Sequence, residues 1–253
     1  MSFEVKFLTK TKVKNPILIE GLPGIGNVGK VAADFLVESL KCKKIIEIHS
    51  HYFPHSVFVN EDNLINLPVV EIWHKKVSKQ DFFFLVGDIQ PIDEASCYKF
   101  CEVVLDVMDK FEGKQIVTLG GIGLQKIPKK PKVYITGNNK EMVSSFKGCS
   151  SKIYGVVGPI MGVTGVLLGA AAKRNVQAVS LLTQTFGHPA YLGIKGSKET
   201  LAVLDKKFNF KLNLKTLSEE IAELEQEIKT KTKKLAEAAT QEQKENNDVN
   251  YFG

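Results

Sequence analysis

Short apolar runs alternate with longer amphipathic segments along most of this 253-residue chain, and glycine-rich turns separate many of them. Strands that alternate with helices predict a mostly parallel sheet with helices on both faces, which is a three-layer αβα core of the α/β class. Strands of such a sheet are apolar on both faces. We expect strands at 17–20, 45–49, 82–86, 115–119, 133–136, 153–157 and 178–183. We expect helices at 28–40, 94–111, 164–174 and 198–207.

Two segments depart from this alternation. Residues 52–74 mix short apolar runs with Asn, Asp and Pro, which indicates an antiparallel excursion or hairpin added to the sheet. Residues 153–172 carry no charge and are about as long as a membrane span. Because Gly158 and Pro159 interrupt this uncharged segment, we interpret it as a strand, a turn and a small-residue helix.

The composition changes after about residue 214. Apolar residues then recur at a spacing that puts one narrow stripe on a charged helix, as in a coiled coil. They are Leu217, Ile221, Leu224, Ile228 and Leu235. We therefore divide the chain into an α/β core at 1–212, an amphipathic, coiled-coil-like helix at 213–244 and a flexible tail at 245–253. Residues 215–253 hold 6 Lys and 9 Asp or Glu, a balance of −3, so the total of +6 leaves +9 on the rest of the chain.

The start of the chain and its cysteines bear on the cellular compartment. Glu4 and Lys6 place charges where a secretory signal peptide is apolar, so we expect a cytoplasmic protein. Cys97 and Cys101 lie four residues apart in an expected helix, which indicates one buried helix face rather than a disulfide or a zinc site. We expect neither a membrane nor a nucleic acid among the partners.

The turn after the first expected strand is rich in glycine. Gly24 to Gly29 form a literal GxGxxG, which on spacing alone indicates a dinucleotide site with Glu47 as its ribose ligand. Gly24 to Lys30 also form GxxxxGK, but Val31 stands where a triphosphatase needs Ser or Thr. Two interpretations remain: the glycines permit a tight strand-to-helix turn, or the loop binds a nucleotide or another anion. The second interpretation assigns the anion to Gly24, Gly26, Asn27, Gly29 and Lys30.

Other residues are weaker candidates for chemistry. The segment HSHYFPH has no Asp, Glu or Cys, so we expect no metal site at its histidines, His49, His51 and His55. Asp88, Asp93 and Glu94 follow an expected strand, where a general acid or base could stand. For Asp93 and Glu94 we favour a helix N-cap and first turn. The sequence holds no paired nucleophile and base, and we expect no catalytic residue and no cofactor.

Several further motifs occur in a fixed order. They are residues 21–30 (GLPGIGNVGK), 53–55 (FPH) before a short hairpin, 87–91 (GDIQP), 118–121 (TLGG) with 131–134 (PKVY), and 162–169 (GVTGVLLG). With this series the chain resembles the archaeal members of the proteasome assembly chaperone family. The likeness covers about residues 15–212 and accounts for Pro23, which fits neither nucleotide motif.

The resemblance implies a phosphorylase/hydrolase-like α/β core that assembles into homo-oligomers and is not chiefly catalytic. It also implies binding to proteasome α-subunits or to the α-ring of the 20S proteasome. Members bind through C-terminal tails that end with a hydrophobic residue, an aromatic residue and any residue. On this chain the motif falls on Tyr251, Phe252 and Gly253. The family's usual penultimate residue is Tyr, so Phe252 keeps the ring but lacks the hydroxyl group.

The physical properties of the tail agree with that role. Aromatic side chains give a large contact area at low entropic cost, and several tails of one oligomer can bind at once. The alternative is that Tyr251 and Phe252 contact the protein's own surface. A hypothesis of another class is an enzyme or sensor that binds a nucleotide or anion at the loop 21–30.

Overall fold

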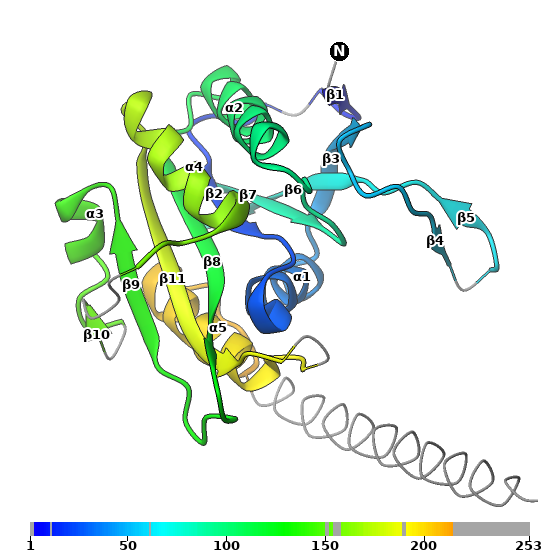
Figure 1. The fold of residues 1–253 in the computed structure, drawn as a ribbon. Helices are drawn as coiled ribbons and strands as arrows, with labels where there is room; N and C mark the ends of the chain where they lie inside the picture. The colour runs from blue at the N-terminus through cyan, green and yellow to red at the C-terminus, as the bar shows by residue number, and fades with distance from the viewer. Residues whose placement is uncertain are drawn as a thin grey trace, which may run out of the picture. The chain divides into compact units, whose positions relative to one another are not determined.

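The computed structural model describes residues 3–10, 12–60, 62–149, 152–153, 158–188 and 191–214. The chain divides into two compact units, Met1–Leu212 and Asn213–Gly253. The central sheet and its helices belong to the first unit (Figure 1). The helix expected at 213–244, with its apolar stripe, and the tail expected at 245–253 lie outside the described residues, except for residues 213 and 214.

Among the described residues, one mixed sheet of nine strands forms the middle layer. Its strand order is β1 (Phe3–Phe7), β3 (Lys43–Ser50), β6 (Val70–Val77), β7 (Gln80–Gly87), β2 (Ile17–Gly21), β8 (Gln115–Leu124), β11 (Gln177–Phe186), β9 (Val133–Gly137) and β10 (Lys152–Ile153). The central neighbours β7, β2, β8 and β11 run parallel. Antiparallel pairs flank them on both sides. The expected α/β fold class is confirmed, with its parallel strands at the centre of the sheet.

Two pairs of helices cover the two faces of the sheet (Figure 1). On one face α2 (Glu94–Lys110) packs against α4 (Gly162–Lys173). On the other face α1 (Val28–Ser39) packs against α5 (Ile194–Phe208). The short helix α3 (Lys140–Ser144) contacts β9 and β11. The three layers of the expected core are thus helices, sheet and helices.

Helix α2 shows how local sequence fixes an element. The carboxylate of Asp93 accepts a hydrogen bond from the Ser96 amide at 2.9 Å, so Asp93 is the N-cap. Glu94 lies in the first turn, where its charge complements the helix dipole. The thiols of Cys97 and Cys101 are free and both residues are buried, which confirms the expected buried face of this helix.

Strand β7 supplies aromatic side chains to both layers of the core. Phe83 lies in the layer between the sheet and α2. Phe82 points to the other face, where its ring centroid lies 5.2 Å from that of Phe208 and 4.9 Å from that of Phe210. Because both faces of the strand are buried, its sequence is a continuous apolar run, and this run made residues 82–86 recognisable as a strand.

The uncharged segment at 153–172 contributes to the core. Residue 153 ends β10, and residues 154–157 of the expected strand lie outside the described residues. Helix α4 begins at Gly162 and buries Val163, Leu167 and Ala171. In the part of the chain that the structure describes, no helix combines the length and apolarity that a membrane span needs.

The expectation for residues 52–74 needs a correction. Only β4 (Phe58–Val59) and β5 (Ile65–Asn66) form a short hairpin, and they pair with each other as a separate two-stranded sheet. The residues from Val70 onward belong to β6, which pairs with β3 and β7 in the main sheet. The sequence patterns also did not predict β1 or α3.

Candidate functional site

The loop that joins β2 to α1 lies at the carboxyl end of the central parallel strands. Its middle is a short turn, Ile25–Asn27, in which φ is 63° at Gly26 and 50° at Asn27. Both angles lie in the left-handed region, which Gly and Asn tolerate better than other residues. The chain can therefore turn sharply from the strand into the helix at these two residues.

Close packing accounts for most glycines of this loop. A Cβ atom on Gly29 would collide with the carbonyl oxygen of Leu119, and a Cβ atom on Gly21 would collide with that of Gly29. A Cβ atom on Gly26 would lie 2.6 Å from a threonine hydroxyl of β11. Around Gly24, in contrast, the space for a Cβ atom is open. These contacts support the interpretation of the loop as a tight structural turn.

Lys30, the one charged residue of the proposed anion-binding loop, already has partners. Its ammonium group lies 2.7 Å from a carboxylate oxygen of Asp34 and 2.7 Å from one of Asp88. Burial lowers the pKa of Lys30, but its hydrogen bonds to the two carboxylates outweigh this effect and leave the pKa above its usual value. Lys30 is therefore charged, and two carboxylates offset the attraction that it could offer to a phosphate.

A buried carboxyl group lies at the base of the loop. Glu20 in β2 has no solvent-exposed surface. Its oxygens accept hydrogen bonds from the Leu22 amide at 3.0 Å and from the Thr164 hydroxyl at 3.3 Å. Burial raises the pKa of Glu20 to about 7, and these hydrogen bonds act in the opposite direction. The sequence patterns above missed this site, although one acidic residue inside an apolar strand is a signal for it.

Neighbouring polar side chains extend the hydrogen bonding around Glu20. The Gln90 amide donates to the Pro23 carbonyl at 2.8 Å, and its oxygen accepts from the Val163 amide at 3.3 Å. The Thr118 hydroxyl donates to the Thr164 carbonyl at 3.2 Å. We call Glu20, Gln90, Thr118 and Thr164 the loop-base cluster. Through these hydrogen bonds the cluster holds the loop against α4.

Glu47 does not lie beside the glycine-rich loop, so the expectation that it is the ribose ligand of a dinucleotide site is wrong. The dinucleotide interpretation needs this acidic residue on the strand next to β2. Glu47 lies in β3 instead, and both β6 and β7 lie between β3 and β2. The chain after β3 returns through β6 and β7, and these strands take the place beside the loop. Glu47 pairs with Lys44 at 2.9 Å.

The histidines do not come together with acidic residues or thiols in a metal-binding set. No group of three or more His, Cys, Asp or Glu residues in the described ranges is placed to bind a metal ion. His49, His51 and His55 lie in β3 or shortly after it. The sequence patterns missed the pair of His74 and Asp81, whose ring nitrogen and carboxylate oxygen lie 2.8 Å apart across the β6–β7 pair.

The five residues assigned to the anion lie together in one turn and the first turn of α1, and anion binding there stays a prediction. The expected docking residues Tyr251, Phe252 and Gly253 lie outside the described residues. Docking through them is likewise a prediction from the sequence.

Comparison with known proteins places this chain among relatives along most of its length. A model of the PAC2 family matches residues 18–231. Two uncharacterized proteins of Methanocaldococcus jannaschii are each 29% identical to the chain. The first alignment covers 100% of both chains, and the second covers 89% of this chain and 90% of the relative.

Solved structures share the fold. The crystal structure of Pyrococcus furiosus PbaB, an archaeal proteasome activator, has a TM-score of 0.84 and 27% sequence identity, and the match covers 90% of this chain and 98% of that chain. Pyrococcus furiosus PbaA, an archaeal homolog of proteasome-assembly chaperone, has a TM-score of 0.79 and 21% identity over 99% of this chain and 100% of that chain.

Proposed function

The chain belongs to the PAC2 family, and we propose that it is a proteasome assembly chaperone-like protein that binds proteasome α-subunits or the 20S α-ring through its C-terminal tail. The observation that carries the proposal is the similarity to Pyrococcus furiosus PbaB, an archaeal proteasome activator, over nearly the whole of that chain. The sequence adds a terminal hydrophobic-aromatic-any motif at Tyr251, Phe252 and Gly253. The core then serves as a scaffold, and no catalytic role is assigned to it.

We further propose that the protein acts as a homo-oligomer in the cytoplasm. One short tail buries little surface and binds weakly. Several tails on one oligomer can bind neighbouring α-subunits together, which raises the avidity by about 10²-fold or more where the geometry permits. Self-association therefore turns a weak docking motif into a stable contact with a ring.

Single substitutions in the tail test this proposal. Phe252→Ala removes the aromatic ring and should weaken binding to cognate α-rings at least about tenfold, as loss of an aromatic anchor does. Phe252→Tyr supplies the hydroxyl of the family's usual residue and should tighten binding about fivefold, the effect of one added hydrogen bond. Biolayer interferometry with immobilised α-rings measures both.

Gly253→Ala is the matched control, because the motif accepts any residue at the last position. It should bind as the wild-type chain does. Equal binding by wild-type protein and the Phe252→Ala variant would exclude the tail as the docking element.

A further inference from the structure

The hairpin formed by β4 and β5 exposes a contiguous set of apolar side chains. Every described residue from 55 to 67 is exposed to solvent. Six of the thirteen large hydrophobic residues that are exposed in the described part of the chain lie here, with exposed fractions from 40% to 73%. They are Val57, Phe58, Val59, Leu64, Ile65 and Leu67. Monomeric soluble proteins rarely leave so many neighbouring apolar side chains in water.

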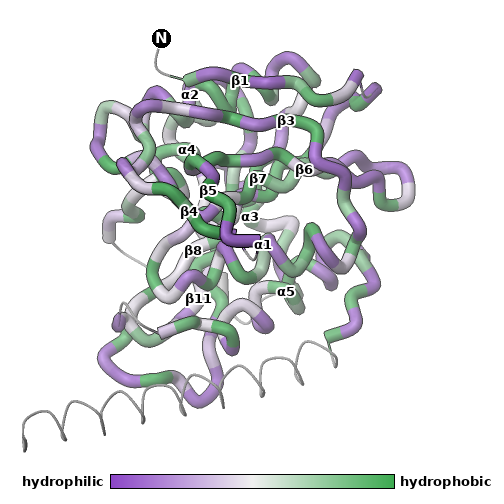
Figure 2. Tube along the Cα trace, turned by 90° about the vertical axis from the view of Figure 1, so that its right-hand side faces the viewer, coloured by the Kyte–Doolittle hydropathy of each residue, from purple (hydrophilic) through white to green (hydrophobic). Residues whose placement is uncertain are grey.

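This hairpin has a defined turn at its tip. The Asn60 side chain accepts hydrogen bonds from the amides of Asp62 at 3.1 Å and Leu64 at 2.8 Å, and Asn63 takes a left-handed conformation with φ of 59°. Such Asx contacts fix a turn. Its strands pair only with each other and extend away from the sheet (Figure 1). Figure 2 looks from the side toward which the hairpin extends, so β4 and β5 lie in front of the sheet there. Because an isolated two-stranded hairpin is marginally stable in water, we expect it to lie against a partner surface.

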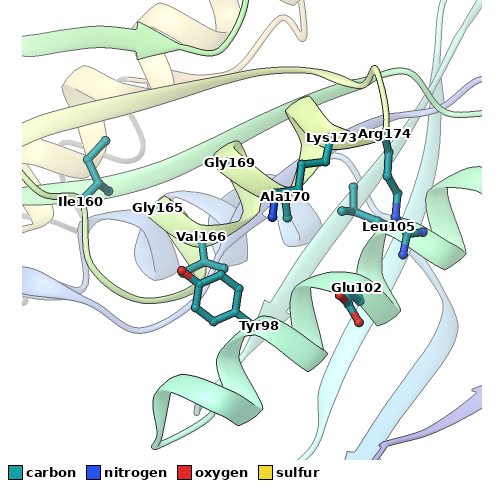
Figure 3. A pocket seen from close by; sticks show the side chains of 10 residues that line it. All are labelled: Tyr98, Glu102, Leu105, Ile160, Gly165, Val166, Gly169, Ala170, Lys173 and Arg174. Carbon is teal, nitrogen blue, oxygen red and sulfur yellow. The ribbon is translucent and has the colours of Figure 1, made fainter.

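A groove between α2 and α4, like the hairpin, has both apolar and charged side chains (Figure 3). Its volume is about 390 Å³. Tyr98, Ile160 and Val166 line one end, and the charged residues Glu102, Lys173 and Arg174 line the other. We call it the α2–α4 groove. In Figure 1 the hairpin extends away from both helices, so it does not cover the groove of its own chain.

Among the described residues, no contact explains one glycine of this groove, Gly169. Gly165 must lack a side chain, because a Cβ atom there would collide with the Ile160 carbonyl oxygen. Gly169, one turn later in α4, has open space at its Cβ position. Glycine inside a helix is about 1 kcal/mol less favourable than alanine. A side chain of another molecule above Gly169 would explain why the chain accepts this cost.

The tip of the hairpin and the charged end of the groove also offer one pair of opposite charges. The hairpin carries apolar strands and an acidic residue, Asp62, at its exposed tip. At the charged end of the groove, Arg174 is paired with Asp106 and Asp109. Lys173 forms no ion pair with the described residues, and it lines the same end of the groove as Glu102. Both surfaces therefore change from apolar to charged along their length.

We infer that the hairpin of one copy of this chain binds in the α2–α4 groove of a second copy. The apolar strands then cover Tyr98 and Val166, an aliphatic side chain fills the space above Gly169, and Asp62 approaches Lys173. The two contacting surfaces differ, so the contact is head-to-tail and can close a ring when the copies repeat it. This inference rests on the proposed self-association and adds the surfaces that form it.

Two variants remove one surface each. In the first, the hairpin variant, Ile65→Asp and Leu67→Asp place charges on exposed positions of the hairpin. In the second, the groove variant, Gly169→Gln puts a good helix former into the open space of the groove. Native mass spectrometry at one protein concentration should show an oligomer for the wild-type chain and monomers for both variants, with association weakened at least about tenfold.

A mixture of the two variants gives the decisive measurement. The hairpin variant keeps an intact groove, and the groove variant keeps an intact hairpin. The equimolar mixture should therefore form a dimer that holds one copy of each variant and grows no further. Ile127→Asp and Lys206→Gln are matched controls at exposed positions away from both surfaces, and both should assemble as the wild-type chain does.

Three results would overturn the inference: a monomeric wild-type chain, a hairpin variant that keeps the wild-type mass, or a mixture without the mixed dimer. None of them bears on the tail. A monomer with an intact tail should still bind α-rings, with lower avidity. A chain that ends at Asn250 should assemble but fail to bind, so failure of the assembly contact and failure of tail docking give different results.

Discussion

Glu20 lies in a central strand of the sheet, and both of its oxygens are hydrogen-bonded within the core. Its pKa of about 7 lies above the ordinary value of 4.5 that it has in an unfolded chain. The folded state therefore binds the proton more tightly than the unfolded state does. The contribution of Glu20 to the free energy of unfolding is therefore largest below about pH 4.5, and it is lost as the pH rises to about 7.

Glu20→Gln should remove this part of the pH dependence. Gln stays neutral, its oxygen can accept from the Leu22 amide, and its amide can donate to the Thr164 hydroxyl. Urea denaturation measures the free energy of unfolding at about pH 5 and at about pH 8. Between these two pH values it should fall by about 2 kcal/mol more for the wild-type protein than for the variant. Glu4→Gln on the exposed edge strand β1 is the control and should follow the wild-type pH profile. Parallel profiles for Glu20→Gln and wild-type protein would contradict the assignment.

For a single residue such as Glu20, the sequence shows that a site exists more readily than it shows which residues contact it. One Glu inside the apolar run 17–20 is visible without a structure. Its partner Thr164 lies 144 positions away, and Lys30 and Asp88 meet only because β2 and β7 are neighbours. Asp93 could be assigned correctly because an N-cap bonds within its own turn.

Among the elements, the glycine-rich loop between β2 and α1 has two interpretations, a tightly packed structural turn or an anion-binding loop, and substitutions of its glycines test the first. Gly29 packs against the carbonyl oxygen of Leu119, so Gly29→Ala should lower the free energy of unfolding by about 2 kcal/mol, as overpacking does. Gly24 has an extended backbone and open space at its Cβ position, so Gly24→Ala should change stability little. Urea denaturation compares the two variants. Equal stability of both would show that packing does not account for the glycines.

Elements with local signals were predictable. Strands at the parallel centre are apolar on both faces, and helices such as α2 repeat their buried residues at helical spacing. Strand β1 was missed although Glu4 and Lys6 alternate with its apolar residues, which is the pattern of a strand with one exposed face. Helix α3 spans five residues, too few for a helical period to be seen. The insertion of β6 and β7 beside β2 depends on long-range pairing.

Considered as a whole, the described core presents exposed surfaces on several elements. Polar groups of the loop-base cluster bond to one another or to nearby backbone groups, whereas the buried Thr185 hydroxyl near the carboxyl end of β11 has no hydrogen-bond partner among the described residues. The apolar hairpin and the α2–α4 groove are exposed on different elements. This division suits a protein that assembles with copies of itself and offers its tails to a larger ring.

The most direct test of this account is native mass spectrometry of the full chain, alone and mixed with cognate proteasome α-rings, beside a version that ends at Asn250. We expect an oligomer for both versions and a complex with the ring only when residues 251–253 are present. Ring binding by the shortened version would contradict tail docking. Absence of binding by both versions would contradict the proteasome as the partner and would favour a small ligand at the glycine-rich loop.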